Sequence, residues 1–125
     1  MAQTIIHLDT SFLIRALRRG SVEDRELHRW LAAKAELAVS AVAWSEFLCG
    51  PLDARQLELA NAIVGNPVPF AGEDARIAAE LFNGSGRRRG SFVDCMIAAA
   101  AIRAEASLAT ANRADFQKFV NLRLA

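Results

Sequence analysis

Four carboxylates are the residues of this chain whose type and spacing could support chemistry. Asp9 follows the first apolar run directly, and Glu46 stands early in the helix expected after the second run. Asp115 follows the run that ends at Thr110, and Asp94 begins the alanine-rich helix that leads into that run. Ligands of open parallel sheets bind beyond the carboxyl ends of the strands. Because the acids are attached to those ends, we expect them to converge on one site.

A cluster of carboxylates is typical of a divalent-cation site. Like charges held close together oppose one another's ionisation unless a cation compensates them. Ligation by oxygen alone suits Mg²⁺ or Mn²⁺, and the sequence has no Cys/His spacing of the kind that binds zinc. Such a site can cleave phosphodiester bonds without a nucleophilic side chain, because the cation polarises a phosphoryl oxygen and makes hydroxide available near neutral pH. We therefore interpret the two histidines, His7 and His28, as structural.

Each acid also has an ordinary structural interpretation. Asp9 can cap the helix that follows it, and Glu46 can be a solvated helix residue. Residues 91–94 (SFVD) and 112–115 (NRAD) both fit a capping box, with the acid at the third helical position. The pattern by itself does not decide between ligands and caps.

The elements that must position the acids alternate between apolar strands and helices. This alternation predicts a three-layer α/β/α sandwich with a mostly parallel central sheet. We expect strands over residues 4–8, 37–40, 107–110 and 120–124, and a short edge strand, limited by prolines, over 66–70. We expect helices over residues 11–19, 21–31, 42–49, 53–64, 73–82, 91–106 and 112–119, with a loop over 83–90.

Length and composition limit the class of protein. The 125 residues suit one domain, residues 1–125, and the 53% apolar and 23% charged fractions describe a globular chain. A net charge of +1 excludes a large single-sign field, so nucleic acid would have to be met by local clusters of charge. We expect Cys49 and Cys95, which lie among apolar neighbours, to be reduced thiols in the core. Neither a leader nor a membrane-spanning run is evident, which favours a cytoplasmic protein.

One glycine-flanked loop concentrates positive charge. Its arginines are Arg87, Arg88 and Arg89. Because the loop ends shortly before Asp94, we expect these guanidinium groups to lie beside the site and to bind RNA phosphates; a solvated loop that only aids solubility is the alternative. Further arginines on the first helix could extend the charge, namely Arg15, Arg18 and Arg19. We expect Phe92 and Trp44 to pack in the core rather than to stack on bases.

Four segments of the chain together resemble the motifs of PIN-domain nucleases in order and spacing. They are residues 8–13 (LDTSFL), 42–47 (VAWSEF), 94–101 (DCMIAAAA) and 108–116 (LATANRADF). The resemblance extends over residues 5–119 and is nearest to the VapC-type toxins of bacterial toxin–antitoxin pairs. It implies a single PIN domain that acts as a metal-dependent endoribonuclease.

The resemblance also implies a role for each acid, all four being metal-binding and catalytic. Asp9 and Asp94 would be the principal ligands of a Mg²⁺ or Mn²⁺ ion. Glu46 would bind that ion or orient the attacking water, and Asp115 would bind a second ion or one of its waters.

Polar residues beside the acids complete the implied site. Ser11, Thr110 and Asn112 would orient the carboxylates through hydrogen bonds. Asn112 stands where some members of the family carry a further acid, so the binding of a second ion stays open.

Partners are implied in the same way, because members of the family bind an antitoxin through apolar helices and often form dimers. The resemblance therefore implies a VapB-type antitoxin and a homodimer. The apolar residues in excess of the expected core are Trp30, Trp44, Phe47, Leu48 and the helix over 57–64.

Other classes fit the sequence less well. A phosphoacceptor receiver domain needs a paired acid after the first strand and a lysine after the last, whereas Thr10 follows Asp9 and Lys118 falls within a predicted helix. A phosphatase of the Asp-x-Asp type needs an aspartate at the position of Ser11. The main alternative is a PIN-like module that binds RNA or protein without catalysis, and a metal titration separates the two.

Overall fold

A computed structural model describes residues 4–88 and 91–125 of the chain. Its elements are β1 (Ile5–Leu8), α1 (Thr10–Ala16), α2 (Val22–Ala32), β2 (Glu36–Ala38), α3 (Ala41–Cys49), α4 (Ala54–Val64), α5 (Gly72–Gly84), α6 (Phe92–Arg103), β3 (Ser107–Ala109), α7 (Arg113–Phe116) and β4 (Arg123–Leu124). None of the helices in the described residues is long and apolar enough to cross a membrane.

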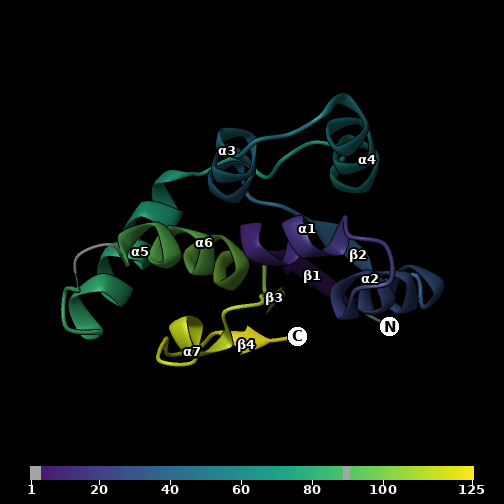
Figure 1. The fold of residues 1–125 in the computed structure, drawn as a ribbon. Coiled ribbons are helices and arrows are strands. Elements are labelled where there is room, and N and C mark those ends of the chain that lie inside the picture. The colour runs from purple at the N-terminus through teal and green to yellow at the C-terminus, as the bar shows by residue number, and fades with distance from the viewer. Residues whose placement is uncertain (1–3, 89–90) are drawn as a thin grey trace.

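The strands form one sheet in the order β2-β1-β3-β4, and every neighbouring pair is parallel. Figure 1 shows α5 and α6 on one side of the strands and α1 and α2 on the other, with α3 and α4 beyond the β2 end. The predicted three-layer α/β/α sandwich is confirmed. Because all strands run the same way, their carboxyl ends lie at one edge of the sheet.

The register between β1 and β3 determines which residues meet at that edge. Leu8 pairs with Ala109, and the N–H of Asp9 donates to the carbonyl of Ala109 over 2.9 Å. The next residues of the two strands, Asp9 and Thr110, are therefore side by side.

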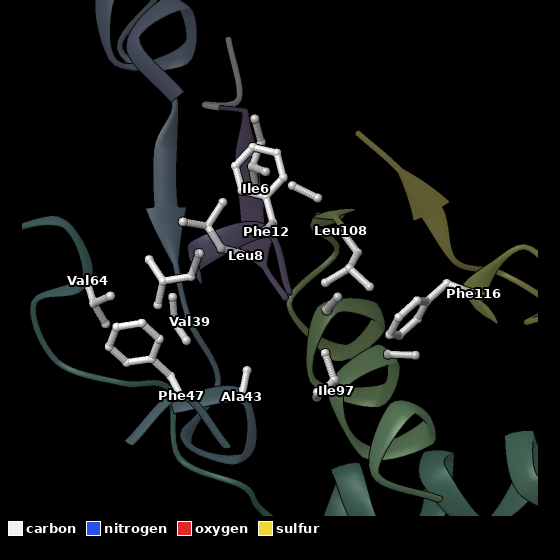
Figure 2. Close-up of a cluster of buried hydrophobic side chains, with 14 of the residues drawn as sticks. Ile6, Leu8, Phe12, Val39, Ala43, Phe47, Val64, Ile97, Leu108 and Phe116 are labelled. Carbon is white, nitrogen blue, oxygen red and sulfur yellow. The ribbon is translucent and has the colours of Figure 1, made fainter. Parts of the chain in front are cut away.

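The core is built from side chains of both ends of the chain. Figure 2 shows Val39, Phe47 and Val64 gathered beside β2, and Leu108 and Phe116 gathered beside α6. The alanines of α6, residues 98–101, are all buried. Their small side chains allow the closely packed neighbours of α6 to approach it, which accounts for the alanine-rich sequence of this helix.

Three helices begin at a side-chain cap. Ser21, Ser40 and Asp53 accept hydrogen bonds from the backbone N–H groups of Asp24, Ala43 and Gln56, respectively. The Asp53–Gln56 capping box is complete, whereas the carboxylate of Asp24 accepts from the N–H of Gly20 instead of that of Ser21. Capping by an oxygen acceptor satisfies backbone donors that have no partner within the helix.

Several predicted boundaries differ from the structure. The predicted edge strand over 66–70 is reduced to a single parallel bridge between Ser40 and Val68, because the prolines on either side of Val68 have no N–H to donate. Helix α1 ends at Ala16, and α5 continues through Gly84 into the predicted loop.

Two predictions of burial were wrong. Cys49 is exposed, because it lies on the outer side of α3, although Cys95 is buried as expected. Phe92 is 43% exposed and meets Phe82 edge to face, with ring centroids 5.4 Å apart. Trp44, in contrast, packs against the core and stacks on Phe47.

Both histidines have structural surroundings. His7 is buried within β1, and burial, reinforced by the positive charge of Arg103, lowers its pKa, so the imidazole is neutral at neutral pH. His28 lies on the surface of α2, 3.1 Å from a carboxylate oxygen of Asp24.

Candidate metal centre

The carboxylate of Asp9 is held firmly at the end of β1. The side chain is only 4% exposed and makes no capping hydrogen bond to α1. Its Oδ2 accepts a hydrogen bond from Ser11 Oγ over 2.8 Å and another from Thr110 Oγ1 over 2.7 Å. Both bonds end on the same oxygen, so the orientation of the carboxylate is determined by the start of α1 and the end of β3 together.

The two hydroxyl groups are themselves fixed by the backbone of the β3–α7 turn. Ser11 Oγ accepts from the N–H of Ala111 over 3.1 Å, and Thr110 Oγ1 accepts from the N–H of Asn112 over 3.0 Å. Each hydroxyl has one proton, which it donates to Asp9. The two hydroxyl oxygens lie 3.3 Å apart but therefore form no hydrogen bond with each other. Asn112 thus supports the site through its backbone N–H.

Glu46 is held by a residue that the sequence analysis did not single out. Its Oε1 accepts a hydrogen bond from Thr10 Oγ1 over 2.9 Å, and Thr10 Oγ1 also lies 3.0 Å from the carbonyl of Ala43. The position of Thr10 between Asp9 and Ser11 was the available signal. Glu46 itself is exposed on α3.

The electrostatics of Asp94 relate it to the other three acids. Partial burial, followed by the negative charges of Asp9, Asp115 and Glu46, raises the pKa of Asp94 to about 6, and the positive charge of Lys118 acts in the opposite direction. Burial is the largest cause of the raised pKa, and each of the three carboxylates contributes more than Lys118 offsets.

The capping interpretation of Asp94 and Asp115 is wrong. The hydroxyl of Ser91 donates to the carbonyl of Arg88 over 2.7 Å and makes no cap for α6. The side chain of Asn112 likewise makes no capping bond to α7. Neither half of the predicted capping boxes is formed, so helix capping does not explain why these two acids stand where they do.

The residues fit a divalent cation by their chemistry. Among the residues that the structure describes, no three side chains of His, Cys, Asp or Glu are gathered tightly enough to enclose an ion. The negative charges that act on Asp94 nevertheless all come from carboxylates, whose oxygens are the ligands preferred by Mg²⁺ and Mn²⁺. Their mutual repulsion is the kind that a divalent cation relieves.

A family model of the PIN domain matches residues 6–121. The chain belongs to the PIN domain family. Solved structures with the same fold include VapBC2 from Rickettsia felis bound to a DNA fragment of its promoter (21% identity, TM-score 0.79, 98% of each chain covered). Another is DNA-bound VapBC from Salmonella typhimurium (17% identity, TM-score 0.78, 98% of each chain).

A third PIN-fold relative is VapC20 from Mycobacterium tuberculosis, described as a toxin that cleaves the sarcin-ricin loop. The two proteins are 20% identical with a TM-score of 0.64, over 94% of this chain and 98% of VapC20. No protein with a curated description matches the sequence.

The arginine loop of this PIN domain leads directly into α6. Arg87 and Arg88 are exposed, and Arg87 adopts a left-handed backbone conformation (φ 55°) with its N–H donating to the carbonyl of Phe82. The hydrogen bonds from Ser91 to the carbonyl of Arg88 tie the loop to the start of the helix that carries Asp94. Arg89 lies outside the described residues.

Proposed function

We propose that this PIN domain is a Mg²⁺- or Mn²⁺-dependent endoribonuclease and the toxin of a cytoplasmic toxin–antitoxin pair. The observation that carries the proposal is the buried carboxylate of Asp9, held by Ser11 and Thr110 at the carboxyl edge of the parallel sheet. The charges of Asp9, Glu46 and Asp115, which come from separate parts of the chain, all act on Asp94. Carboxylates that repel one another destabilise the folded chain unless a cation is bound. Because the PIN domain family contains nucleases, we take metal binding to be the shared role of these acids.

The proposed division of labour follows from the surroundings of each acid. Asp9 and Asp94 are the principal ligands, with Oδ2 of Asp9 taken up by two hydroxyl donors and Oδ1 left for the ion. Glu46, the exposed acid on α3, binds the ion or orients the attacking water. Asp115 binds a second ion or one of its waters. When bound, a divalent cation supplies the positive charge that polarises a phosphoryl oxygen and makes hydroxide available near neutral pH.

Neighbouring hydroxyl groups orient the carboxylates of the site. Ser11 and Thr110 hold Asp9 in one orientation, and Thr10 holds Glu46, in the way that outer hydrogen bonds position metal ligands in general. Asp94 must lose its proton to act as a ligand, and its pKa of about 6 allows this at neutral pH. Because no three acids in residues 4–88 and 91–125 are gathered tightly enough to enclose an ion, ion binding requires the side chains to adjust.

RNA is the substrate that the charge distribution favours. The exposed Arg87 and Arg88, with Arg89 beside them in the sequence, supply guanidinium groups for phosphates next to the helix of Asp94. The description of VapC20 as an RNA-cleaving toxin supports the same substrate class for this chain.

The partner that we propose is a VapB-type antitoxin, together with a second copy of the chain. Two of the similar structures are VapBC complexes. The chain has a depression of about 780 Å³ between α2 and α4, and exposed leucines on these helices include Leu31, Leu57 and Leu59. Apolar surface of this kind is typical of an interaction site.

The test is metal-dependent cleavage of single-stranded RNA. The wild-type chain should cleave with Mg²⁺ or Mn²⁺ and stop in chelator, and Asp9→Asn should lose both cleavage and inhibition of growth. Asp53→Asn is the matched control for cleavage, because Asp53 caps α4, Asn is an equally good cap and Asp53 is not one of the four acids. RNA binding without cleavage would favour the non-catalytic binding module instead, and full activity in chelator would rule out the metal site.

A further inference from the structure

A second concave surface lies between the C-terminal half of α5, the end of α6 and the segment that follows α7. The cavity measures about 330 Å³. Ile77, Leu81 and Ile102 supply apolar walls, and Lys118 and Asn121 contribute polar groups. The lining also includes the charged residues Arg76 and Glu80, and the volume is near the lower end of the range for small-ligand sites.

Lys118 is the available positive charge of this cavity. The other basic residue that lines it, Arg76, is held by ion pairs with Glu73 and Glu80. In the described part of the chain, no carboxylate forms an ion pair with Lys118. The ammonium lies 5.4 Å from the centroid of the Phe119 ring, so its stem is supported by an almost fully buried aromatic residue.

The same lysine connects the cavity to the acids. Lys118 follows Asp115 by three residues, in the turn that continues α7, and α7 packs against α6, the helix that carries Asp94. Gly84 and Ser85, which end α5 and begin the arginine loop, also line the cavity. The cavity therefore borders the loop that carries Arg87 and, through Lys118, the turn that follows Asp115.

We propose that this cavity holds one unstacked nucleotide of a single-stranded RNA and that Lys118 binds the phosphate joining that nucleotide to the cleaved bond. The inference rests on the proposed function. The apolar walls receive a base, as apolar and aromatic side chains do for splayed-out bases in general, and the ammonium meets an anionic phosphate. Lys118 is thus an RNA-binding residue beside the acids.

The dimensions favour a nucleotide over a helical peptide. At about 330 Å³, the cavity is less than half as large as the depression of about 780 Å³ between α2 and α4. A flat base with its ribose fits such a space, and the wider depression between α2 and α4 is the better match for a helix.

The first experiment measures RNA binding without cleavage. A fluorescein-labelled single-stranded RNA of about 12 random nucleotides, a length suited to a strand-binding groove, is titrated with the full chain in chelator at several salt concentrations. Each phosphate contact contributes about 0.7 to the slope of log affinity against log salt for single strands. We expect Lys118→Met to weaken binding and lower the slope by about 0.7, and Lys118→Arg to restore both.

The matched control is Lys34→Met, the same substitution at the chain's other lysine. Lys34 precedes β2 and so lies towards the amino-terminal edge of the sheet, opposite the acids. Its substitution should leave the slope at the wild-type value. Equal slopes for Lys118→Met and the wild type would overturn the inference, and melting temperatures of both variants show that the comparison is between folded proteins.

The second experiment asks whether a base enters the cavity. Adenosine, uridine, guanosine and cytidine 5′-monophosphates are added separately to the isotope-labelled chain, and backbone amide NMR signals are followed. A base in the cavity should shift the signals of Ile77, Ile102 and Asn121 with at least one nucleotide, whereas ribose 5-phosphate should shift only those around Lys118. Unchanged cavity signals with all four nucleotides would overturn the base-binding part.

Failure of this inference is distinguishable from failure of the proposed function. If the wild type cleaves RNA with Mn²⁺ while Lys118→Met binds RNA like the wild type, only the nucleotide site is wrong. If the wild type neither binds nor cleaves single-stranded RNA, both proposals are wrong.

Discussion

Thr110 at the end of β3 and Asp9 at the end of β1 are joined by a hydrogen bond of 2.7 Å from Oγ1 of the threonine to Oδ2 of the aspartate. The parallel register that pairs Leu8 with Ala109 places these residues side by side, although they are separated by most of the chain. The bond is made between two side chains of the chain itself. One carboxylate oxygen is thereby fixed by the fold, and the entropic cost of orienting a metal ligand is met during folding.

Removing this hydroxyl should weaken metal binding. Thr110→Val deletes the donor to Asp9 and leaves the N–H of Asn112 without its acceptor, and loss of such outer contacts typically lowers metal affinity about 10–100-fold. We expect an unfolding free energy lower by about 1–3 kcal/mol, because buried polar groups lose their partners. Calorimetric titration with Mn²⁺ and urea unfolding measure the two effects.

Thr110→Ser is the control for that prediction, since it keeps the hydroxyl and removes only a methyl group. It should retain most of the metal affinity. Equal losses for the valine and serine variants would show that the packing of Thr110, rather than its bond to Asp9, is what the site requires.

Thr10 should affect activity more than stability. Thr10→Val removes the donor to Glu46, which is exposed, so the folding cost should be at most about 1 kcal/mol. If Glu46 binds the ion or orients water, RNA cleavage should fall about 10-fold or more. Cleavage rates at saturating Mn²⁺, compared with those of Thr10→Ser, test this. An unchanged cleavage rate in the valine variant would show that cleavage does not depend on the hydrogen bond from Thr10 to Glu46.

The raised pKa of Asp94 predicts how stability depends on pH without metal. The pKa of Asp94 is about 6 in the folded chain, above the value of about 3.9 expected in the unfolded chain. The folded state therefore binds more protons between these values, and the stabilising contribution is complete below about pH 4 and lost as the pH rises through 6. One pKa unit corresponds to about 1.4 kcal/mol, and solvent screening of this half-buried group leaves about 1–2 kcal/mol.

Urea unfolding in chelator, at about pH 5 and about pH 8, measures this dependence. Asp94→Asn should reduce the difference between the two pH values and make the metal-free chain more stable at the higher pH, because the amide carries no charge. If the variant and the wild type show the same pH dependence, other groups titrate and Asp94 is not the acid that feels its neighbours.

The fold could be predicted from the sequence because its signals are local. Short apolar runs that alternate with helix patterns predict a parallel sheet, and this prediction does not depend on the order of the strands in the sheet. The boundaries were less certain where two local preferences compete. Val68 shows this, since an apolar residue between prolines favours a strand by its side chain but has neighbours that cannot pair.

The site was only partly predictable, because its geometry depends on contacts between distant residues. The positions of Asp9, Glu46, Asp94 and Asp115 made them candidates, but pattern alone could not distinguish ligands from caps. The hydrogen bond from Thr10 to Glu46 requires α1 and α3 to be adjacent, and the approach of Lys118 to Asp94 requires the turn after α7 to reach α6. These contacts depend on tertiary packing, so local sequence patterns cannot predict them.

The last prediction tests directly whether Asp94 and Asp115 bind the ion. A cation that binds only the folded state raises its stability, by about 2.7 kcal/mol at a concentration 100 times Kd. For a chain of this size that corresponds to a rise in Tm of about 10 °C. We expect the wild type to show the rise with millimolar Mg²⁺ or Mn²⁺, Asp94→Asn to show none, and Asp115→Asn to show part of it. Asp53→Asn, at a residue that does cap a helix, should show the full rise. Thermal unfolding of the four proteins with and without metal decides the matter, and an equal rise in all four would mean that neither Asp94 nor Asp115 is a ligand.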